Sequence, residues 1–329
     1  MPVTITAGIT FSGGGLTMSP PPSTIPTAGW YGVASSPSAG YMSTLQRITY
    51  ETDTATASIR GQLSVQRTQL GAVSTLTYGW WGGGYAGGVG SFSLVDRMTF
   101  ATDTATNVAR GPLTTILTTQ AASSDNTTYG WFGGGAIGQN GTRISTVTRI
   151  TYANDTAVST DRGPLSQVKR HLVASSNTTN GWFGGGYAYD GNTVGAIYYS
   201  TVDRITYATD TATASVRGPL SLALFYSAAT GNSTDGWFAG GYTTGYSLRS
   251  TVNRITYATD TATASVRGPL SVAKGQGNAT GDPTYGWYAA GTTVQRITYA
   301  TDTNTATERG PMAFSIYNGG TNGACAGVQ

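Results

Sequence analysis

The sequence predicts an all-β protein folded as a single β-propeller, and three observations support this prediction. The composition favours short strands and tight turns, because 47 of the 329 residues are glycine, 20 are tyrosine and only 10% are charged. A unit of about 50 residues recurs along most of the chain, which is the repeat length of a propeller blade. Each unit contains four short strand-like segments separated by turn residues, as a four-stranded antiparallel blade requires.

The repeat contains an arginine-bearing strand with very constant spacing. The segment 201–221 recurs almost unchanged at 251–271. Looser copies are centred on Arg47, Arg97, Arg149 and Arg296. In all six copies an aspartate follows six positions later and a second arginine thirteen positions later, giving Asp53, Asp103, Asp155, Asp210, Asp260 and Asp302 as the aspartates. We interpret this framework as structural and expect each Arg–Asp pair to tie the two strands of one hairpin together.

The elements of one unit can be followed in order from Val202. Residues 202–207 alternate apolar and polar side chains, as a half-buried strand does. Residues 208–211 carry an aspartate that can bond its own downstream backbone, so they predict a turn. Residues 213–217 form the returning strand, which ends at a Gly-Pro pair. Residues 225–230 and 236–241 supply the other two strands, and the terminal glycines of the latter suit close approach of neighbouring backbones.

A tryptophan recurs at a fixed place in every unit, after a glycine and before further aromatic and glycine residues. The six positions are Trp30, Trp80, Trp131, Trp182, Trp237 and Trp287. A ring of tryptophans could stack on sugars, but the fixed register favours packing between adjacent blades, where a large aromatic fills the wedge.

The chain ends are expected to close the ring. Residues 313–317 and 323–327 form a spare pair of strands, and residues 3–12 form a hairpin that can complete them. Because closure removes exposed sheet edges, we favour seven blades with residues 3–12 paired to residues 313–327; six blades and a docked tail are the alternative. The chain is then one domain over 1–329, with a closing hairpin at 1–15, six repeats at 16–312 and the closing C-terminal strands at 313–329.

The repeat resembles the kelch repeat. Trp182 to Gly186 stands where the kelch glycine pair ends a strand, and Val202 to Tyr207 resembles the kelch strand that ends in Tyr-Asp-Pro. The kelch tryptophan that follows is absent here. The amino-acid sequence of the repeat also resembles the kelch-like repeats in virion proteins of marine tailed phages. This resemblance implies a virion structural or host-adhesion protein, such as a tail-fibre, tail-adaptor or surface-decoration subunit, located on the extracellular particle.

Composition and motifs argue against several other classes of function. The net charge is +3 with dispersed arginines, so no nucleic-acid partner is expected. No apolar run approaches the length of a membrane span, so no membrane insertion is expected. With one cysteine (Cys325) and one histidine (His171), the chain cannot form a cysteine-based or histidine-rich metal site, and no metal is expected. No catalytic motif is present, so we expect neither an enzyme nor a cofactor.

The candidate binding site lies in the connection that varies in length. The distance from each tryptophan to the next framework arginine ranges from 9 to 22 residues, whereas the following arm is constant at 33 or 34. By propeller geometry these connections share one face, and tyrosine with small polar residues is typical of adaptable binding surfaces. The candidate residues for contact with a partner or glycan are Tyr187, Tyr189, Asp190, Asn192, Tyr198, Tyr199, Tyr242 and Tyr246.

Three functions are consistent with this surface. The first is the virion role, with other virion proteins or a cell-surface receptor, including a glycan, as partners and with a homo-oligomer as a further option. The second is a carbohydrate-binding, lectin-like module. The third is an intracellular kelch adaptor for protein–protein interaction, which is disfavoured because the sequence shows no domain beyond the propeller.

Overall fold

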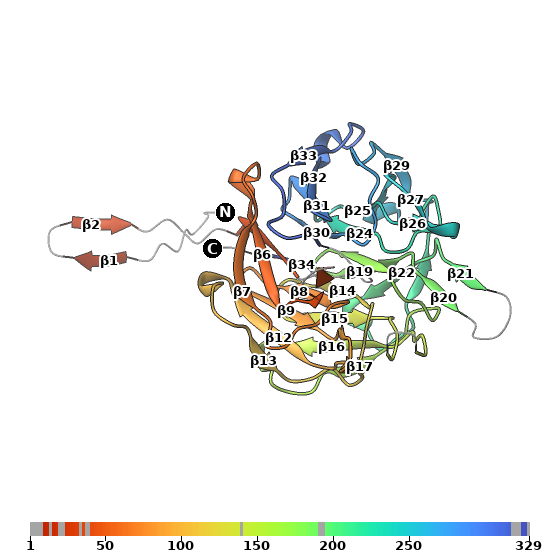
Figure 1. Cartoon of the computed structure of the whole chain (residues 1–329), viewed down its shortest axis with the longest axis horizontal. Coiled ribbons are helices and arrows are strands. Elements are labelled where there is room, and N and C mark those ends of the chain that lie inside the picture. The colour runs from red at the N-terminus through yellow and green to blue at the C-terminus, as the bar shows by residue number, and fades with distance from the viewer. Residues whose placement is uncertain are drawn as a thin grey trace, which may run out of the picture.

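A computed structural model describes residues 9–12, 15–18, 24–32, 35–36, 40–138, 141–189, 195–316 and 324–327. These residues contain six four-stranded antiparallel sheets arranged around a central axis (Figure 1). The helical segments among them are short 3-10 turns. The protein is therefore an all-β propeller with four-stranded blades, as the sequence predicts.

Each blade consists of four strands that follow one another from the central axis outward. The first blade contains β34 (Ala324–Gly327), β3 (Ala28–Tyr31), β6 (Thr44–Thr49) and β7 (Ser58–Gln62), and the second contains β8 (Gly71–Ser74), β9 (Tyr78–Gly82), β12 (Val95–Thr99) and β13 (Val108–Arg110). The third contains β14 (Ala121–Ser124), β15 (Tyr129–Gly133), β16 (Val147–Thr151) and β17 (Thr160–Arg162), and the fourth contains β18 (Val173–Ser176), β19 (Asn180–Gly184), β22 (Val202–Thr206) and β23 (Ser215–Arg217). The fifth contains β24 (Ala228–Gly231), β25 (Asp235–Ala239), β28 (Val252–Thr256) and β29 (Ser265–Arg267), and the sixth contains β30 (Asn278–Gly281), β31 (Tyr285–Ala290), β32 (Thr293–Thr298) and β33 (Thr307–Arg309).

The ring closes in the first blade and has six blades, so the six-bladed alternative is confirmed and the favoured seventh blade is wrong. The C-terminal strand β34 pairs with β3 and places Cys325 opposite Trp30. The first tryptophan strand thus takes its inner neighbour from the other end of the chain. Residues 313–316 belong to the last connection instead, where Ile316 bridges to Gly291.

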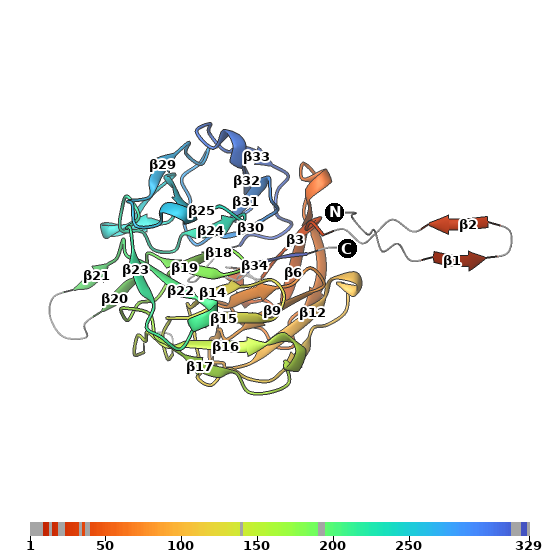
Figure 2. The same cartoon turned by 180° about the vertical axis from the view of Figure 1, so that it is seen from behind.

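The N-terminal hairpin does not contribute a strand to the ring. β1 (Ile9–Ser12) pairs with β2 (Gly15–Met18), and together they form a two-stranded sheet of their own. Figures 1 and 2 show this hairpin outside the ring, on the side opposite β20 and β21. The expected pairing of residues 3–12 with residues 313–327 is therefore wrong for β1; residues 3–8 and 317–323 lie outside the described part of the chain.

The tryptophans pack between adjacent blades, as the sequence predicts. Each is at most 1% exposed. Each stacks on the aromatic residue that follows the arginine strand of the next blade, with ring centroids 3.8–4.2 Å apart. The last pair, Trp287 with Tyr50, joins the sixth blade to the first. The stacked rings fill the wedge between neighbouring sheets and bury large apolar areas at every interface.

The framework Arg–Asp pairs also join neighbouring blades, which corrects the expectation that they tie one hairpin. The aspartate ends a short 3-10 turn, and its Oδ2 accepts the indole N–H of the preceding blade's tryptophan at 2.8–2.9 Å. The same Oδ2 lies 2.8–3.1 Å from Nη1 of the first arginine and 3.3–3.5 Å from Nε of the second. We call each group of one tryptophan, two arginines and one aspartate a clasp.

The clasps form a closed cycle around the propeller. Trp30, Arg47 and Arg60 hold Asp103 of the next blade, and the pattern repeats until Trp287, Arg296 and Arg309 of the sixth blade. That last group holds Asp53 of the first blade. Because every aspartate is buried and carries a charge-assisted hydrogen bond, the clasps fix the angle between neighbouring blades. The outcome is a rigid ring on which loops can be displayed.

Candidate functional site

The variable connections lie at one end of the ring, which we call the insertion face. Antiparallel order brings two types of connection to this end, those between the second and third strands of a blade and those that lead into the next blade. Bridges between Thr68 and Tyr85 and between Arg170 and Tyr187 confirm that the two types meet. The insertions are the hairpins β4 (Ser35–Ser36) with β5 (Gly40–Tyr41), β10 (Tyr85–Ala86) with β11 (Gly90–Ser91), β20 (Tyr187–Tyr189) with β21 (Ala196–Tyr198), and β26 (Tyr242–Thr243) with β27 (Ser247–Leu248).

Aromatic side chains of the fourth and fifth blades gather on this face around Phe225. The Phe225 ring lies 5.2 Å from Tyr187, 5.0 Å from Tyr198, 5.7 Å from Tyr242 and 5.4 Å from Tyr246. We call these five residues, together with Tyr226, the aromatic cluster. The hairpins β20–β21 and β26–β27 of adjacent blades therefore meet, and Phe225 joins them.

The predicted contact residues differ in how much of each side chain is accessible. Tyr189 is 53% exposed and Tyr246 is 60% exposed. Tyr187 is only 4% exposed and is therefore a buried member of the cluster. Tyr198, Tyr199 and Tyr242 are half-buried, and partial burial raises the pKa of Tyr199. Asp190 and Asn192 lie outside the described residues. Among the predicted residues that the structure describes, Tyr189 and Tyr246 are thus the most accessible.

Arg170 and His171 lie beneath the aromatic cluster and fix its position. Arg170 donates from Nε and Nη2 to the Tyr187 hydroxyl at 3.0 and 2.6 Å. The His171 ring contacts Tyr226 at 3.8 Å and stacks on Tyr187 at 5.4 Å between centroids. Burial, and then the charges of Arg170 and Arg143, lower the His171 pKa well below its usual range, so this imidazole is neutral at pH 7.

Sequence reasoning missed Phe225, Tyr226 and Arg170 because they lie in the arm of constant length. Thr68, Thr118, Arg170 and Phe225 each form the same bridge to an insertion, so they are equivalent positions in four successive connections. At this repeat position the residue changes from threonine in the first two connections to arginine and then to phenylalanine. That change is the sequence signal that could have revealed Arg170 and Phe225. The large residues stand at the two connections that meet the hairpins β20–β21 and β26–β27.

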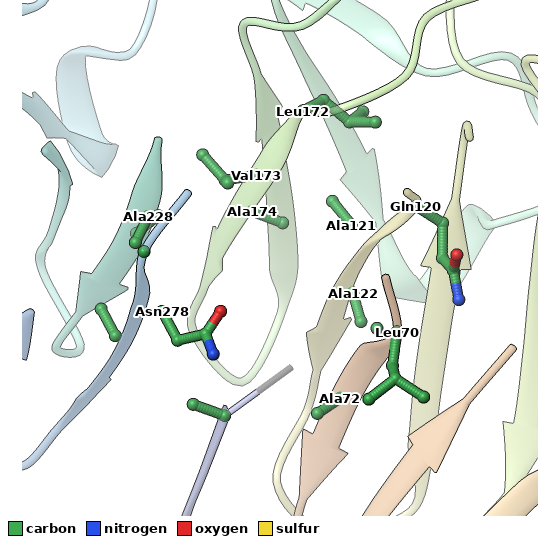
Figure 3. A pocket seen from close by; sticks show the side chains of 15 residues that line it. Leu70, Ala72, Gln120, Ala121, Ala122, Leu172, Val173, Ala174, Ala228 and Asn278 are labelled. Atoms are coloured by element: carbon green, nitrogen blue, oxygen red, sulfur yellow. The ribbon is translucent and has the colours of Figure 1, made fainter. Parts of the chain in front are cut away.

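The opposite end of the ring is a polar funnel. The strand-to-strand turns that follow the inner strands line a cavity of about 500 Å³ with serine, threonine and asparagine residues. Its apex narrows to a central channel of about 80 Å³ (Figure 3). Every inner strand contributes alanine to this channel, and the equivalent positions in the six strands are Ala72, Ala122, Ala174, Ala229, Ala279 and Ala324. The two ends of the propeller thus differ in chemistry: the insertion face is aromatic, and the funnel is polar and includes Asp282.

A membrane span and a metal centre are two other kinds of site that the described ranges could contain. No helix there is long and apolar enough to cross a membrane. No group of three or more histidine, cysteine, aspartate or glutamate side chains in those ranges is arranged to hold a metal ion.

Comparison with known proteins supports the fold. No family model matches the sequence, and no curated protein matches it. Among solved structures, one titled "Structure of YjhT" superposes with a TM-score of 0.66 over 86% of this chain and 95% of that chain, at 10% sequence identity. At this identity the similarity shows the fold alone. The propeller fold is compatible with a non-catalytic binding module. A more specific function has to be argued from the residues of the site.

Proposed function

We propose that this protein is a non-enzymatic binding module that attaches to its partner through the insertion face. The observation that carries the proposal is the aromatic cluster, which two adjacent blades assemble on a rigid ring. Tyr189 and Tyr246 present large exposed rings next to it. Tyrosine supplies contact area with few torsions to immobilise, so such rings are suited to be anchors at an interface.

Exposed aliphatic side chains extend this surface. Val89 is 74% exposed, and Ile197 and Leu248 are each 47% exposed, all on insertions. Together with Tyr189 and Tyr246 they give the apolar and aromatic composition that the centre of a binding surface requires. The clasps keep the blades that carry these residues at a fixed angle, so little ordering is needed when a partner binds.

We further propose that the module acts on a virus particle, as a structural or host-adhesion subunit of the kelch-like type. This role rests on the resemblance of the repeat sequence to the repeat sequences of virion proteins. A lectin-like module is the second candidate, favoured by the exposed tyrosine rings, which can stack on the apolar face of a sugar. Detection of the protein by mass spectrometry in purified particles tests the virion role, and its absence from them would remove that role.

The double variant Tyr189→Ala with Tyr246→Ala is expected to fold normally and to bind its partner about 30-fold more weakly, or about 2 kcal/mol. Adsorption of the labelled protein to host cells measures the effect. Val108→Ala with Val216→Ala is the matched control, because these side chains are 55% and 57% exposed on outer strands, away from the insertion face. Equal adsorption of the Tyr189/Tyr246 variant and the control would contradict the proposal.

A further inference from the structure

The connections that lead into the second to sixth blades share one position whose residue varies widely in size. Each connection contains a residue with a left-handed backbone, and the N–H of each such residue donates to the carbonyl of the previous one at 2.7–3.1 Å; these residues are Gln69, Thr119, His171, Tyr226 and Gln276. The residues that precede them are therefore equivalent, and they are Thr68, Thr118, Arg170, Phe225 and Gly275. Glycine, the smallest residue, thus stands at this position in the connection to the sixth blade.

A side chain at position 275 would meet the ring of Tyr242. A Cβ added to Gly275 would overlap Cε2, Cδ2 and Cζ of that ring, and these three are the nearest atoms to it. The Gly275 backbone lies outside the left-handed region, so its conformation accepts a residue with a side chain. The tyrosine ring, rather than the backbone, is therefore what favours glycine at this position.

The length of the insertions explains why a ring lies at this place. Phe225 bridges to Tyr242 of the blade into which its connection leads. The sixth blade offers only a short turn to Gly275, because β31 ends at Ala290 and β32 begins at Thr293. The Tyr242 ring of the fifth blade extends to Gly275 instead.

Tyr242 links Gly275 to the exposed ring of Tyr246. The Tyr242 ring stacks on Phe225 with 5.7 Å between centroids and an interplanar angle of 29°. Tyr246 meets Tyr242 at 5.9 Å and Phe225 at 5.4 Å, in both cases edge to face. Tyr246 is 60% exposed, so these two rings are its support on the protein side. A displaced Tyr242 ring would therefore shift the side chain that is most exposed in the predicted site.

We propose that Gly275 is a positioning residue of the insertion face: because it has no side chain, the Tyr242 ring lies against the connection and holds Tyr246 in the orientation that the partner contacts. This inference rests on the proposed function and adds a residue that shapes its contact surface. A larger residue at position 275 turns the Tyr242 ring away without unfolding the blade, since a side-chain torsion can change while the backbone stays in place.

The test is Gly275→Thr in the full chain. Threonine already stands at the equivalent positions 68 and 118, so we expect the melting temperature to stay within a few degrees of that of the unchanged protein. Adsorption to host cells is expected to weaken about fivefold, because the aromatic rings are no longer oriented for the partner. Hydroxyl-radical modification of Tyr242, which is half-buried, is expected to become faster.

Ala109→Thr is the matched control. It adds a side chain of the same final size on the outer strand β13, where Ala109 is exposed and away from the insertion face. We expect this variant to adsorb as the unchanged protein does and to leave the modification rate of Tyr242 unaltered.

A double-mutant cycle with Tyr242→Ala separates positioning from a structural role of Gly275. Tyr242→Ala removes the ring that an added side chain would meet. In that background we expect Gly275→Thr to cause no further loss of adsorption, so the two losses are not additive. Additive losses would mean that Gly275 acts through something other than the tyrosine ring, and they would overturn the inference.

Three further outcomes decide the matter. A large fall in the melting temperature of Gly275→Thr would overturn the inference, because the connection itself would then require glycine. If Gly275→Thr adsorbs as well as Ala109→Thr while Tyr189→Ala with Tyr246→Ala adsorbs weakly, the positioning role fails and the proposed function stands. If the Tyr189/Tyr246 variant also adsorbs normally, the proposed function fails and the positioning role fails with it.

Discussion

Ending the chain after Ile316 is expected to lower the free energy of unfolding by at least about 4 kcal/mol. This loss is larger than most single substitutions cause. The truncation removes β34, which pairs with β3 over four residues. It also removes Cys325 from the core cluster that contains Trp30 and Trp81. The first blade then loses its inner strand, and the inner edge of β3 loses its partner. Thermal unfolding followed by circular dichroism measures the effect.

Deletion of residues 1–18 is the matched control for this truncation. It removes β1 and β2, which pair with each other rather than with a blade. We therefore expect the melting temperature of the ring to stay within a few degrees of that of the full chain, since no blade loses a strand. A large loss on this deletion, with a small loss on removing β34, would contradict the assignment of the closing strand and favour a ring completed from the N-terminus.

Asp103→Ala is expected to cost about 3–5 kcal/mol, because the change leaves buried positive charge without its partner. The Asp103 carboxylate accepts hydrogen bonds from Trp30 and Arg47 and lies 3.5 Å from Arg60, so its loss affects three groups of the neighbouring blade at once. Asp103→Asn retains an oxygen for the indole N–H and should cost less than the alanine variant. Denaturant unfolding of the variants measures both values.

Glu51→Ala is the control for the clasp variants. Glu51 lies in the 3-10 turn η1 (Tyr50–Thr52) just before Asp53, is exposed, and changes the net charge by the same amount. Its expected effect is within about 0.5 kcal/mol. A cost at Asp103 as small as the cost at Glu51 would show that the clasps do not hold the blades together, and the rigid ring would then need another explanation.

The sequence predicts much of the fold because the repeat is strongly constrained. The constant spacing of Arg204, Asp210 and Arg217 marks two strands and their turn, and the structure places β22, η4 (Tyr207–Thr209) and β23 there. The same spacing cannot tell which blade an aspartate faces. A pair within one hairpin and a pair between adjacent blades leave identical patterns when every blade repeats, so the direction of the clasps emerges only in three dimensions.

The number of blades was harder to predict because the closing strand has lost the features of the repeat. β34 carries Cys325 where other inner strands have valine, serine or threonine, and it pairs with a strand almost 300 residues earlier. The N-terminal segment has strand-like residues of its own, which made it an equally good partner by sequence pattern. Pairing choice between two such segments depends on register and packing, which local sequence does not encode.

The candidate site could be predicted in place but not in detail. Length variation correctly marks the insertion face, because loops tolerate insertions where strands do not. It cannot separate Tyr189, which is exposed, from Tyr187, which is buried two residues earlier in the same strand. Nor does it reveal Phe225 or Arg170, whose importance depends on a neighbouring hairpin that meets them in the folded ring.

The most direct test of the insertion face as the contact surface is hydroxyl-radical footprinting of the protein alone and bound to host cells or to a particle. Tyr189 and Tyr246 are exposed and oxidisable, so their modification rates report directly on contact. We predict strong protection of these two residues and of Leu248 on binding, with unchanged rates at Ile59, Val108 and Val216 on the outer strands. Protection confined to the funnel turns or the outer strands, with Tyr189 and Tyr246 still freely oxidised, would contradict the account.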